Sequence, residues 1–232
     1  MFPIVLLAYA DRHRRERSET MSEMNTKAMY KLTYGLFVCT AKQGDKLNGC
    51  IINTAIQVAS EPNQISVAIN KANLTHDMVK TTGTCNISMI SREAKFDLFQ
   101  HFGFQSGRDV NKFGDYPAAN YKLADNGIPY ILAGTNAYMS LTVTQTVDLG
   151  SHTLFICEPT AMEVLSDAGS CSYEYYQAEI KPRPQPVGTT SQGKTIWRCV
   201  ICGYEWEGEE LPDGFICPIC KHPKDDFEKI VR

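Results

Sequence analysis

Four of the nine cysteines stand in one short segment near the carboxyl end of the chain, with a spacing that can bind a metal ion. Cys199, Cys202, Cys217 and Cys220 form the pattern C-x2-C-x14-C-x2-C. Each C-x2-C pair can form a tight turn that brings two thiolates to the same ion, so two pairs complete a tetrahedral site. Zinc and iron both accept four thiolate ligands, so the spacing alone leaves the identity of the metal open.

The other cysteines are scattered singly through the earlier part of the sequence. They are Cys39, Cys50, Cys85, Cys157 and Cys171. An odd total of nine argues against the fully paired disulfide framework of a secreted protein. Isolated cysteines are typical of small buried side chains. We therefore expect free thiols and a reducing, cytoplasmic location.

The metal-binding segment differs in composition from what precedes it. Residues 181–194 contain three prolines and two glycines and are almost free of apolar side chains, which is typical of a linker. Residues 195–232 are too few to form a stable core unaided, and metal binding can supply the missing free energy of folding. We expect residues 24–180 to form the main domain and residues 1–23 to be a disordered extension.

The main domain is predicted to be rich in strands. Alternating, β-branched segments predict strands at 36–41, 47–60, 64–70, 84–90, 137–149 and 152–165. Helices are predicted at 24–35, 76–82 and 91–103, with Thr75 as a candidate N-cap and Gly83 as a stop. Residues 103–135 contain many turn residues and resist assignment. Many strands with few helices indicate a barrel, because closure removes sheet edges.

Composition and motifs exclude several classes of function. The net charge of −3 gives no electrostatic basis for binding nucleic acid. No apolar run approaches the roughly 20 residues that span a bilayer, so we expect no membrane partner. The sequence contains neither G-x-x-x-x-G-K-[ST] nor G-x-G-x-x-G, so neither a P-loop nor a Rossmann site is indicated.

The cysteine segment resembles the rubredoxin family, in particular the rubredoxin tail of rubrerythrins. Gly203 and Tyr204 follow the second cysteine, and Pro218 follows the third. The residues that correspond to the aromatic core of the family are Trp206, Phe215 and Phe227. The resemblance implies one iron ion per chain, bound by the four cysteines, and structural zinc is the alternative.

The main domain resembles the flavin reductase-like family, the FMN-binding split barrels. The segments that carry the resemblance are 48–54, 60–62, 68–76, 102–109 and 148–159, and their order makes it specific. It implies a mainly β fold, a split β-barrel with a few helices, joined here to a small C-terminal rubredoxin-like metal domain. It also implies bound FMN and a homodimer.

The same resemblance indicates which residues meet the cofactor. Hydroxyl, amide and cationic side chains can bind the phosphate and the polar edge of the flavin ring. The expected flavin-binding residues are Asn48, Gly49, Cys50, Asn53, Thr54, Lys71, Thr75, Ser106 and Arg108. His152 lies in the turn where the family places a histidine near flavin and nicotinamide, so it is the expected catalytic residue.

Together, the two halves of the chain indicate an electron-transfer oxidoreductase. A flavin accepts a hydride and can release single electrons, which a mononuclear iron site can accept. The expected route runs from NAD(P)H through FMN and the iron to a redox partner. Chains of this layout resemble the high-molecular-weight rubredoxins, and that resemblance implies a flavodiiron protein that reduces nitric oxide or dioxygen as the partner.

Two other functions stay open at this point. The chain could be a flavin reductase that supplies reduced FMN to a partner, with the metal domain as a structural zinc tail. It could also be a barrel that holds FMN or haem without turnover. The sequence does not distinguish NADH from NADPH, because it contains no recognisable motif for the 2′-phosphate.

Overall fold

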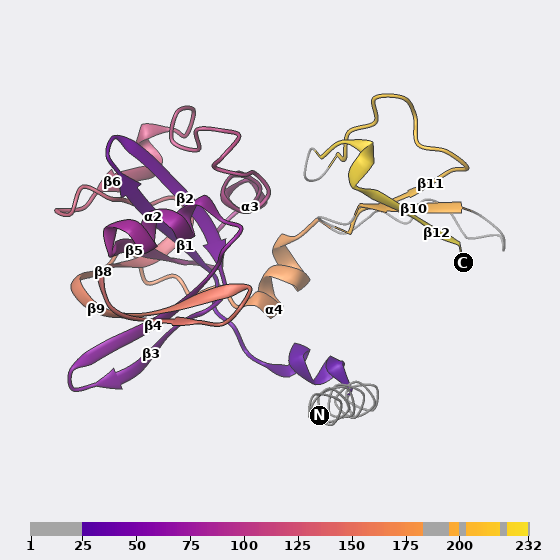
Figure 1. Ribbon diagram of the computed structural model, residues 1–232. Coiled ribbons are helices and arrows are strands. Elements are labelled where there is room, and N and C mark those ends of the chain that lie inside the picture. The colour runs from indigo at the N-terminus through magenta and orange to yellow at the C-terminus, as the bar shows by residue number, and fades with distance from the viewer. Residues whose placement is uncertain (1–24, 183–194, 200–202, 219–221, 232) are drawn as a thin grey trace, which may run out of the picture. The chain divides into compact units, whose positions relative to one another are not determined.

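The computed structural model describes residues 25–182, 195–199, 203–218 and 222–231 (Figure 1). The expected extension 1–23 and most of the expected linker lie outside the described residues. The first elements are η1 (Thr26–Lys31), β1 (Phe37–Gln43), β2 (Lys46–Ile52), β3 (Ala55–Ser60), β4 (Asn63–Asn70), α2 (Leu74–Thr82), β5 (Thr84–Ile90) and α3 (Phe96–Gly103). They are followed by η2 (Ala118–Asn120), β6 (Tyr121–Leu123), β7 (Pro129–Ile131), β8 (Thr135–Asp148), β9 (His152–Val164), α4 (Tyr173–Tyr175) and η3 (Tyr176–Ile180). The last elements are β10 (Thr195–Cys199), β11 (Glu205–Glu207), η4 (Lys224–Asp226) and β12 (Phe227–Val231).

Seven strands form one antiparallel sheet in the order β2-β1-β5-β8-β9-β4-β3. Strands β2 and β3 lie at opposite edges of this order, yet only Asn53 and Thr54 separate them in the sequence. A connection this short reaches about 11 Å at most. The sheet must therefore curl until its two edges approach each other, which makes it a barrel with a seam at Asn53–Thr54.

This seam corrects one sequence prediction. The single strand expected at 47–60 is two strands, because the chain leaves one sheet edge at Ile52 and joins the other at Ala55. The Thr54 carbonyl accepts a bond from the N–H of Ala68 on β4, which begins the new pairing. An uninterrupted β-branched pattern carries no information about which neighbour a strand pairs with, so the break left little trace in the sequence.

The barrel interior is apolar and contains most of the scattered cysteines. Its buried members include Cys39, Cys85 and Cys157 together with Ile69 and Phe155. Cys50 belongs to the same cluster, whereas Cys171 is buried in a second cluster against α3. All five are free thiols, as predicted. Burial raises the pKa of Cys171 to about 11, so this thiol is neutral and unreactive at physiological pH.

The remaining predicted strands are confirmed, and two of the three predicted helices are confirmed as α2 and α3 with shifted ends. Helix α3 begins at Phe96 rather than at residue 91. The N–H of Ser91 donates to Gly134 and that of Arg92 to Gly169, so these residues are tied to other segments before the helix starts. The predicted helix 24–35 is the short 3-10 helix η1, in a unit separate from that which begins at Tyr34. A short isolated segment gains too little packing to support an α-helix.

Helix α2 holds a second correction. Its N-cap is Asn73, and Thr75 lies inside the first turn with a fully buried side chain instead of capping the helix. Gly83 ends the helix at φ +70°, as its position predicted. The turn-rich stretch 103–135 contains η2 and the β6–β7 hairpin. Buried Asn86 of β5 donates to the Ile128 carbonyl at 2.8 Å and fixes the hairpin to the barrel.

The C-terminal module is a small sheet in the order β11-β10-β12. Its core gathers Cys199, Cys217 and Phe227 with flanking aromatic side chains. In the described part of the chain no helix has the length and apolar character needed to cross a bilayer.

Candidate functional site

Segments far apart in the sequence meet at one pocket on the barrel. The pocket is lined by β2, by the start of α2, by the loop after α3 and by Lys112. Four of the nine residues predicted to bind flavin are among the lining residues, namely Asn48, Cys50, Thr75 and Ser106. The structure therefore brings together residues that the sequence had only grouped by resemblance.

Asn48 is the most informative residue of this pocket. It is 2% exposed, and its Nδ2 donates to the Thr75 hydroxyl at 3.0 Å. Its Oδ1 has no hydrogen-bond partner among the described residues. Leaving a buried carbonyl unpaired costs roughly 1–3 kcal/mol, which a ligand N–H would recover.

Gly107 shapes the same corner of the pocket. A Cβ at this position would lie 2.2 Å from Oδ1 of Asn48, closer than two such atoms can approach. Only glycine therefore lets the loop after α3 close over the Asn48 amide. Beside it, burial raises the pKa of the Cys50 thiol, so Cys50 is neutral and contributes shape rather than charge.

Lys112 is a pocket residue that the sequence analysis missed. Its side chain is buried, and its Nζ donates to the carbonyls of Gly49 and Phe102 at 2.9 Å each. Burial lowers its pKa to about 8. One sequence signal marked Lys112 as a site residue, namely its place shortly after Arg108. No periodic pattern in this turn-rich stretch indicates that its side chain is buried.

Two predicted cations flank the pocket and do not line it. Arg108 follows Gly107 and donates to Asp77 of α2 at 2.6 Å, which lowers the pKa of that carboxyl group. Lys71 pairs with Asp148 at 2.7 Å. Their side chains are 47% and 34% exposed, so both are accessible to solvent beside the pocket.

The other predicted residues lie outside the lining. Thr54 donates to the Asn53 side chain at 2.9 Å, and the two form the barrel seam. His152 begins β9, where it pairs with Asn70 in the ladder. The Lys71 N–H donates to Ser151 at 3.0 Å, so the turn that holds His152 is bonded to the segment before α2.

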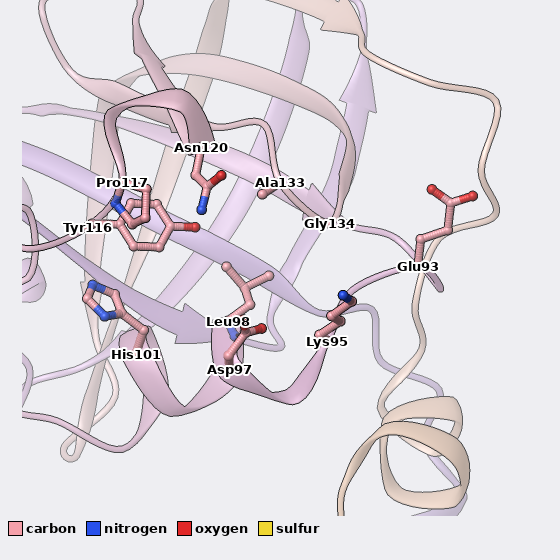
Figure 2. A pocket seen from close by; sticks show the side chains of 10 residues that line it. All are labelled: Glu93, Lys95, Asp97, Leu98, His101, Tyr116, Pro117, Asn120, Ala133 and Gly134. Atoms are coloured by element: carbon pink, nitrogen blue, oxygen red, sulfur yellow. The ribbon is translucent and has the colours of Figure 1, made fainter.

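A second pocket, of about 410 Å³, lies beside the start of α3 (Figure 2). Among its lining side chains, the rings of His101 and Tyr116 lie 4.7 Å apart. Burial raises the pKa of Tyr116 to about 12, so this phenol stays protonated. None of the predicted flavin-binding residues lines this pocket, and no lining residue has a buried polar atom without a partner. The barrel pocket with Asn48 is therefore the better candidate site.

In the C-terminal module, strands β10 and β11 pair as a hairpin on either side of the first C-x2-C pair. The N–H of Cys199 donates to the Tyr204 carbonyl at 2.8 Å, and Arg198 pairs with Glu205 outside it. Gly203 has φ +76°, and its N–H donates back to the Cys199 carbonyl at 2.8 Å. A left-handed residue at this point is what turns the chain back after the second cysteine.

The described residues on either side of the second C-x2-C pair repeat this pairing. The N–H of Cys217 donates to the His222 carbonyl at 2.8 Å, and Ile216 forms a bridge with Pro223. In both hairpins the first cysteine bonds to the residue five positions on, and the pair outside it spans seven positions. Two equivalent hairpins are what a symmetrical four-thiolate site requires.

Two of the four predicted metal ligands, Cys199 and Cys217, lie among the described residues. Cys199 and Cys217 are fully buried, and the packing of Phe215 against Phe227, 5.4 Å between ring centroids, covers this core. The other two predicted ligands, Cys202 and Cys220, lie outside the described residues.

Comparison with known proteins identifies the family of each part of the chain. The model of the flavin reductase like domain matches residues 29–182. This chain belongs to the flavin reductase-like family. The model of the rubrerythrin, rubredoxin-like domain matches residues 197–228. The fold is thus mainly β, with a small C-terminal rubredoxin-like domain, as predicted.

Individual proteins are similar to all or part of this chain. The high molecular weight rubredoxin of Moorella thermoacetica is 38% identical over 233 residues, which cover 89% of this chain and all of that protein. The ferric-chelate reductase (NAD(P)H) of Archaeoglobus fulgidus is 35% identical over 72% of this chain and 96% of its own length. The NADH:FAD oxidoreductase of Streptomyces globisporus superposes with a TM-score of 0.57 at 18% identity, covering 70% of this chain and 92% of that one. This last likeness supports the fold alone.

The residues present fit the groups that the two families imply. The barrel pocket offers an unpaired buried acceptor, a buried ammonium and hydroxyl groups, which suit the polar edge of a flavin. The C-terminal module offers buried thiols on two equivalent hairpins, which suit iron or zinc.

Proposed function

We propose that this chain passes electrons from NAD(P)H to a partner protein through FMN in the barrel and one iron ion in the C-terminal module. The chain is an oxidoreductase of the flavin reductase-like family with a rubredoxin-like domain, and the proposal assigns its donor and its route. One observation carries it: a single chain combines a pocket that holds an unpaired buried acceptor, Oδ1 of Asn48, with a pair of equivalent cysteine hairpins.

In this proposal the barrel pocket holds the flavin ring. Oδ1 of Asn48 accepts a ring N–H, while Gly107 leaves room for the amide. The bound flavin supplies an acceptor for hydride that can pass electrons on singly. The buried position of Thr75 and Lys112 keeps water away from the inner side of the pocket.

The solvent-exposed residues beside the pocket suit the phosphate. Lys71 and Arg108 provide cations, Ser106 provides a hydroxyl group, and a dianion placed there stays hydrated. We assign Asn53 and Thr54 to the same group of polar residues that would bind the phosphate. We assign His152 the role of contacting the nicotinamide of NAD(P)H. The turn that holds His152 is hydrogen-bonded to the segment that carries Lys71, which lies beside the pocket.

The C-terminal module would hold iron through Cys199, Cys202, Cys217 and Cys220. Iron bound in this way supplies a one-electron acceptor and donor. Each hydride brings two electrons, so oxidation of one NAD(P)H supports two successive one-electron deliveries to the partner. The hairpins and the aromatic core keep the ligands in place during both deliveries.

We further propose a flavodiiron-type protein as the acceptor and a homodimer as the working state. Exposed Glu209, Glu210 and Asp213 give the module an acidic surface that suits a basic partner.

The homodimer is supported by exposed apolar side chains on the barrel. Ile56 and Val58 of edge strand β3 are 63% and 52% exposed, and a second chain would cover them.

The proposal is tested by the composition and spectrum of anaerobically purified full-length protein. We expect FMN that stays bound through gel filtration, one iron per chain and the absorption of a ferric tetrathiolate. NADH and NADPH are then added separately, and the loss of each chromophore is followed. Flavin that dissociates freely, together with one zinc per chain, would identify instead a flavin reductase with a structural metal tail.

A further inference from the structure

Lys112 carries a buried positive charge without a counter-charge. Its side chain is 3% exposed, and no carboxylate among the described residues forms an ion pair with it. Its contacts are the neutral carbonyls of Gly49 and Phe102. Buried charges in proteins are normally paired, because removal of an ammonium group from water is costly. An unpaired one that lines a pocket indicates a ligand with negative charge.

The ammonium group also has an unused donor. Lysine carries three N–H donors, and the carbonyls of Gly49 and Phe102 accept two of them. Lys112 lines the pocket beside Asn48 and Cys50, so the third donor is available to whatever the pocket holds. The two carbonyl contacts fix Nζ in position and prevent it from following a mobile ligand to the surface.

Burial separates the role of Lys112 from that of the other cations. Lys71 and Arg108 are 34% and 47% exposed and pair with Asp148 and Asp77. Exposed cations suit a phosphate that keeps its hydration. Lys112 lies within the wall and therefore meets the ring portion of a flavin rather than its phosphate.

We propose that Lys112 raises the reduction potential of the bound flavin by favouring its reduced form. The inference rests on the proposed function, because it requires flavin in this pocket. Hydride addition to the neutral ring leaves one extra electron pair and a net negative charge there. A fixed cation stabilises that charge and has little to stabilise in the oxidised ring.

The charge of Lys112 depends on few neighbours. The titratable groups that face it are Cys50 on β2, whose pKa burial raises, and His101 on α3, which bonds to the Lys112 carbonyl at 2.6 Å. Cys50 stays a neutral thiol and does not compensate the ammonium. The pKa of Lys112 itself is about 8 without a ligand, and an anion in the pocket would raise it.

The test compares wild-type protein with Lys112→Met and Lys112→Arg, and with Lys122→Met as a control that removes the same charge from the surface. Dissociation constants are measured for oxidised and for reduced FMN. We expect Lys112→Met to weaken binding of the reduced form at least tenfold more than that of the oxidised form. A tenfold difference equals a fall of ~30 mV in the two-electron potential. Lys112→Arg and Lys122→Met should keep the wild-type ratio.

Equal weakening of both forms would overturn the inference, because it would place Lys112 against the phosphate or in a purely structural role. If Lys112→Met does not fold, wild type and Lys112→Arg are compared as pH rises from 7.5 to 10. Wild type should lose its preference for reduced FMN as the lysine deprotonates, while the arginine variant should keep it. A parallel response would again overturn the inference. Failure of wild type to bind any flavin would instead overturn the proposed function.

Discussion

The side-chain amide of Asn48 donates a hydrogen bond to the Thr75 hydroxyl group at 3.0 Å and thereby joins strand β2 to helix α2. The same amide leaves its Oδ1 unpaired at the pocket. One side chain thus fixes the geometry of the wall and offers the acceptor that a flavin N–H requires.

Replacement of Asn48 by alanine should weaken FMN binding by about tenfold, or ~1.4 kcal/mol, because the ligand loses its acceptor. The measurement is a fluorescence titration of flavin into flavin-free protein. Asn136→Ala is the matched control, since Asn136 is also buried with an unpaired Oδ1 but does not line this pocket. Equal losses in both variants would show that Asn48 acts only through stability.

Gly107→Ala should abolish tight flavin binding, because the added Cβ would overlap Oδ1 of Asn48 and force the loop away. Gly169→Ala serves for comparison, since a Cβ there meets nothing closer than 3.6 Å. Both variants are assayed for retained FMN after gel filtration. Normal retention by Gly107→Ala would mean that the loop need not close over the amide.

Replacement of Cys217 by serine should release the metal and unfold the C-terminal module, since small metal domains draw on the order of 10 kcal/mol from binding. The barrel should still bind FMN, because its core is separate. Metal analysis and flavin content of the purified variant check both statements. Cys171→Ser should leave the iron content unchanged, and a loss there would contradict the assignment of ligands.

The stability of the flavin-free protein should rise with pH above neutrality relative to Lys112→Met. Burial lowers the pKa of Lys112 from 10.5 to about 8, so between these values the unfolded chain binds more protons than the folded one. The penalty of about 3 kcal/mol is fully present below pH 8 and disappears as pH approaches 10.5. Urea unfolding at pH 7.5 and pH 10 measures it. A constant difference between the two proteins would contradict the assignment.

Much of the site could be predicted from local sequence signals. The two C-x2-C pairs and Gly203 specify the hairpins directly, because a tight turn depends only on neighbouring residues. The strands of the barrel followed from alternation, except for the break between β2 and β3. Asn48 and Thr75 were expected to bind flavin from the family resemblance rather than from a local signal, and both line the pocket, although Thr75 was also expected to cap a helix.

What could not be predicted depends on contacts between distant segments. The break at Asn53–Thr54 exists because the sheet curls, and a local pattern does not show curling. The position of Lys112 in a turn-rich stretch would predict a surface side chain. The side chain is buried because Gly49 and Phe102, which are distant in the sequence or on another element, approach it. Residues of this kind are found by asking which buried charges lack a partner.

The central claim is that electrons reach the iron through the flavin. Stopped-flow mixing of the full-length protein with NAD(P)H under anaerobic conditions tests it most directly, with flavin and iron absorption followed separately and Cys220→Ala as the variant without a complete metal site. The account predicts that flavin is reduced first and iron second in the wild type, and that the variant reduces its flavin at the wild-type rate without passing electrons to an acceptor protein. Iron that stays oxidised while the flavin is fully reduced would contradict the account.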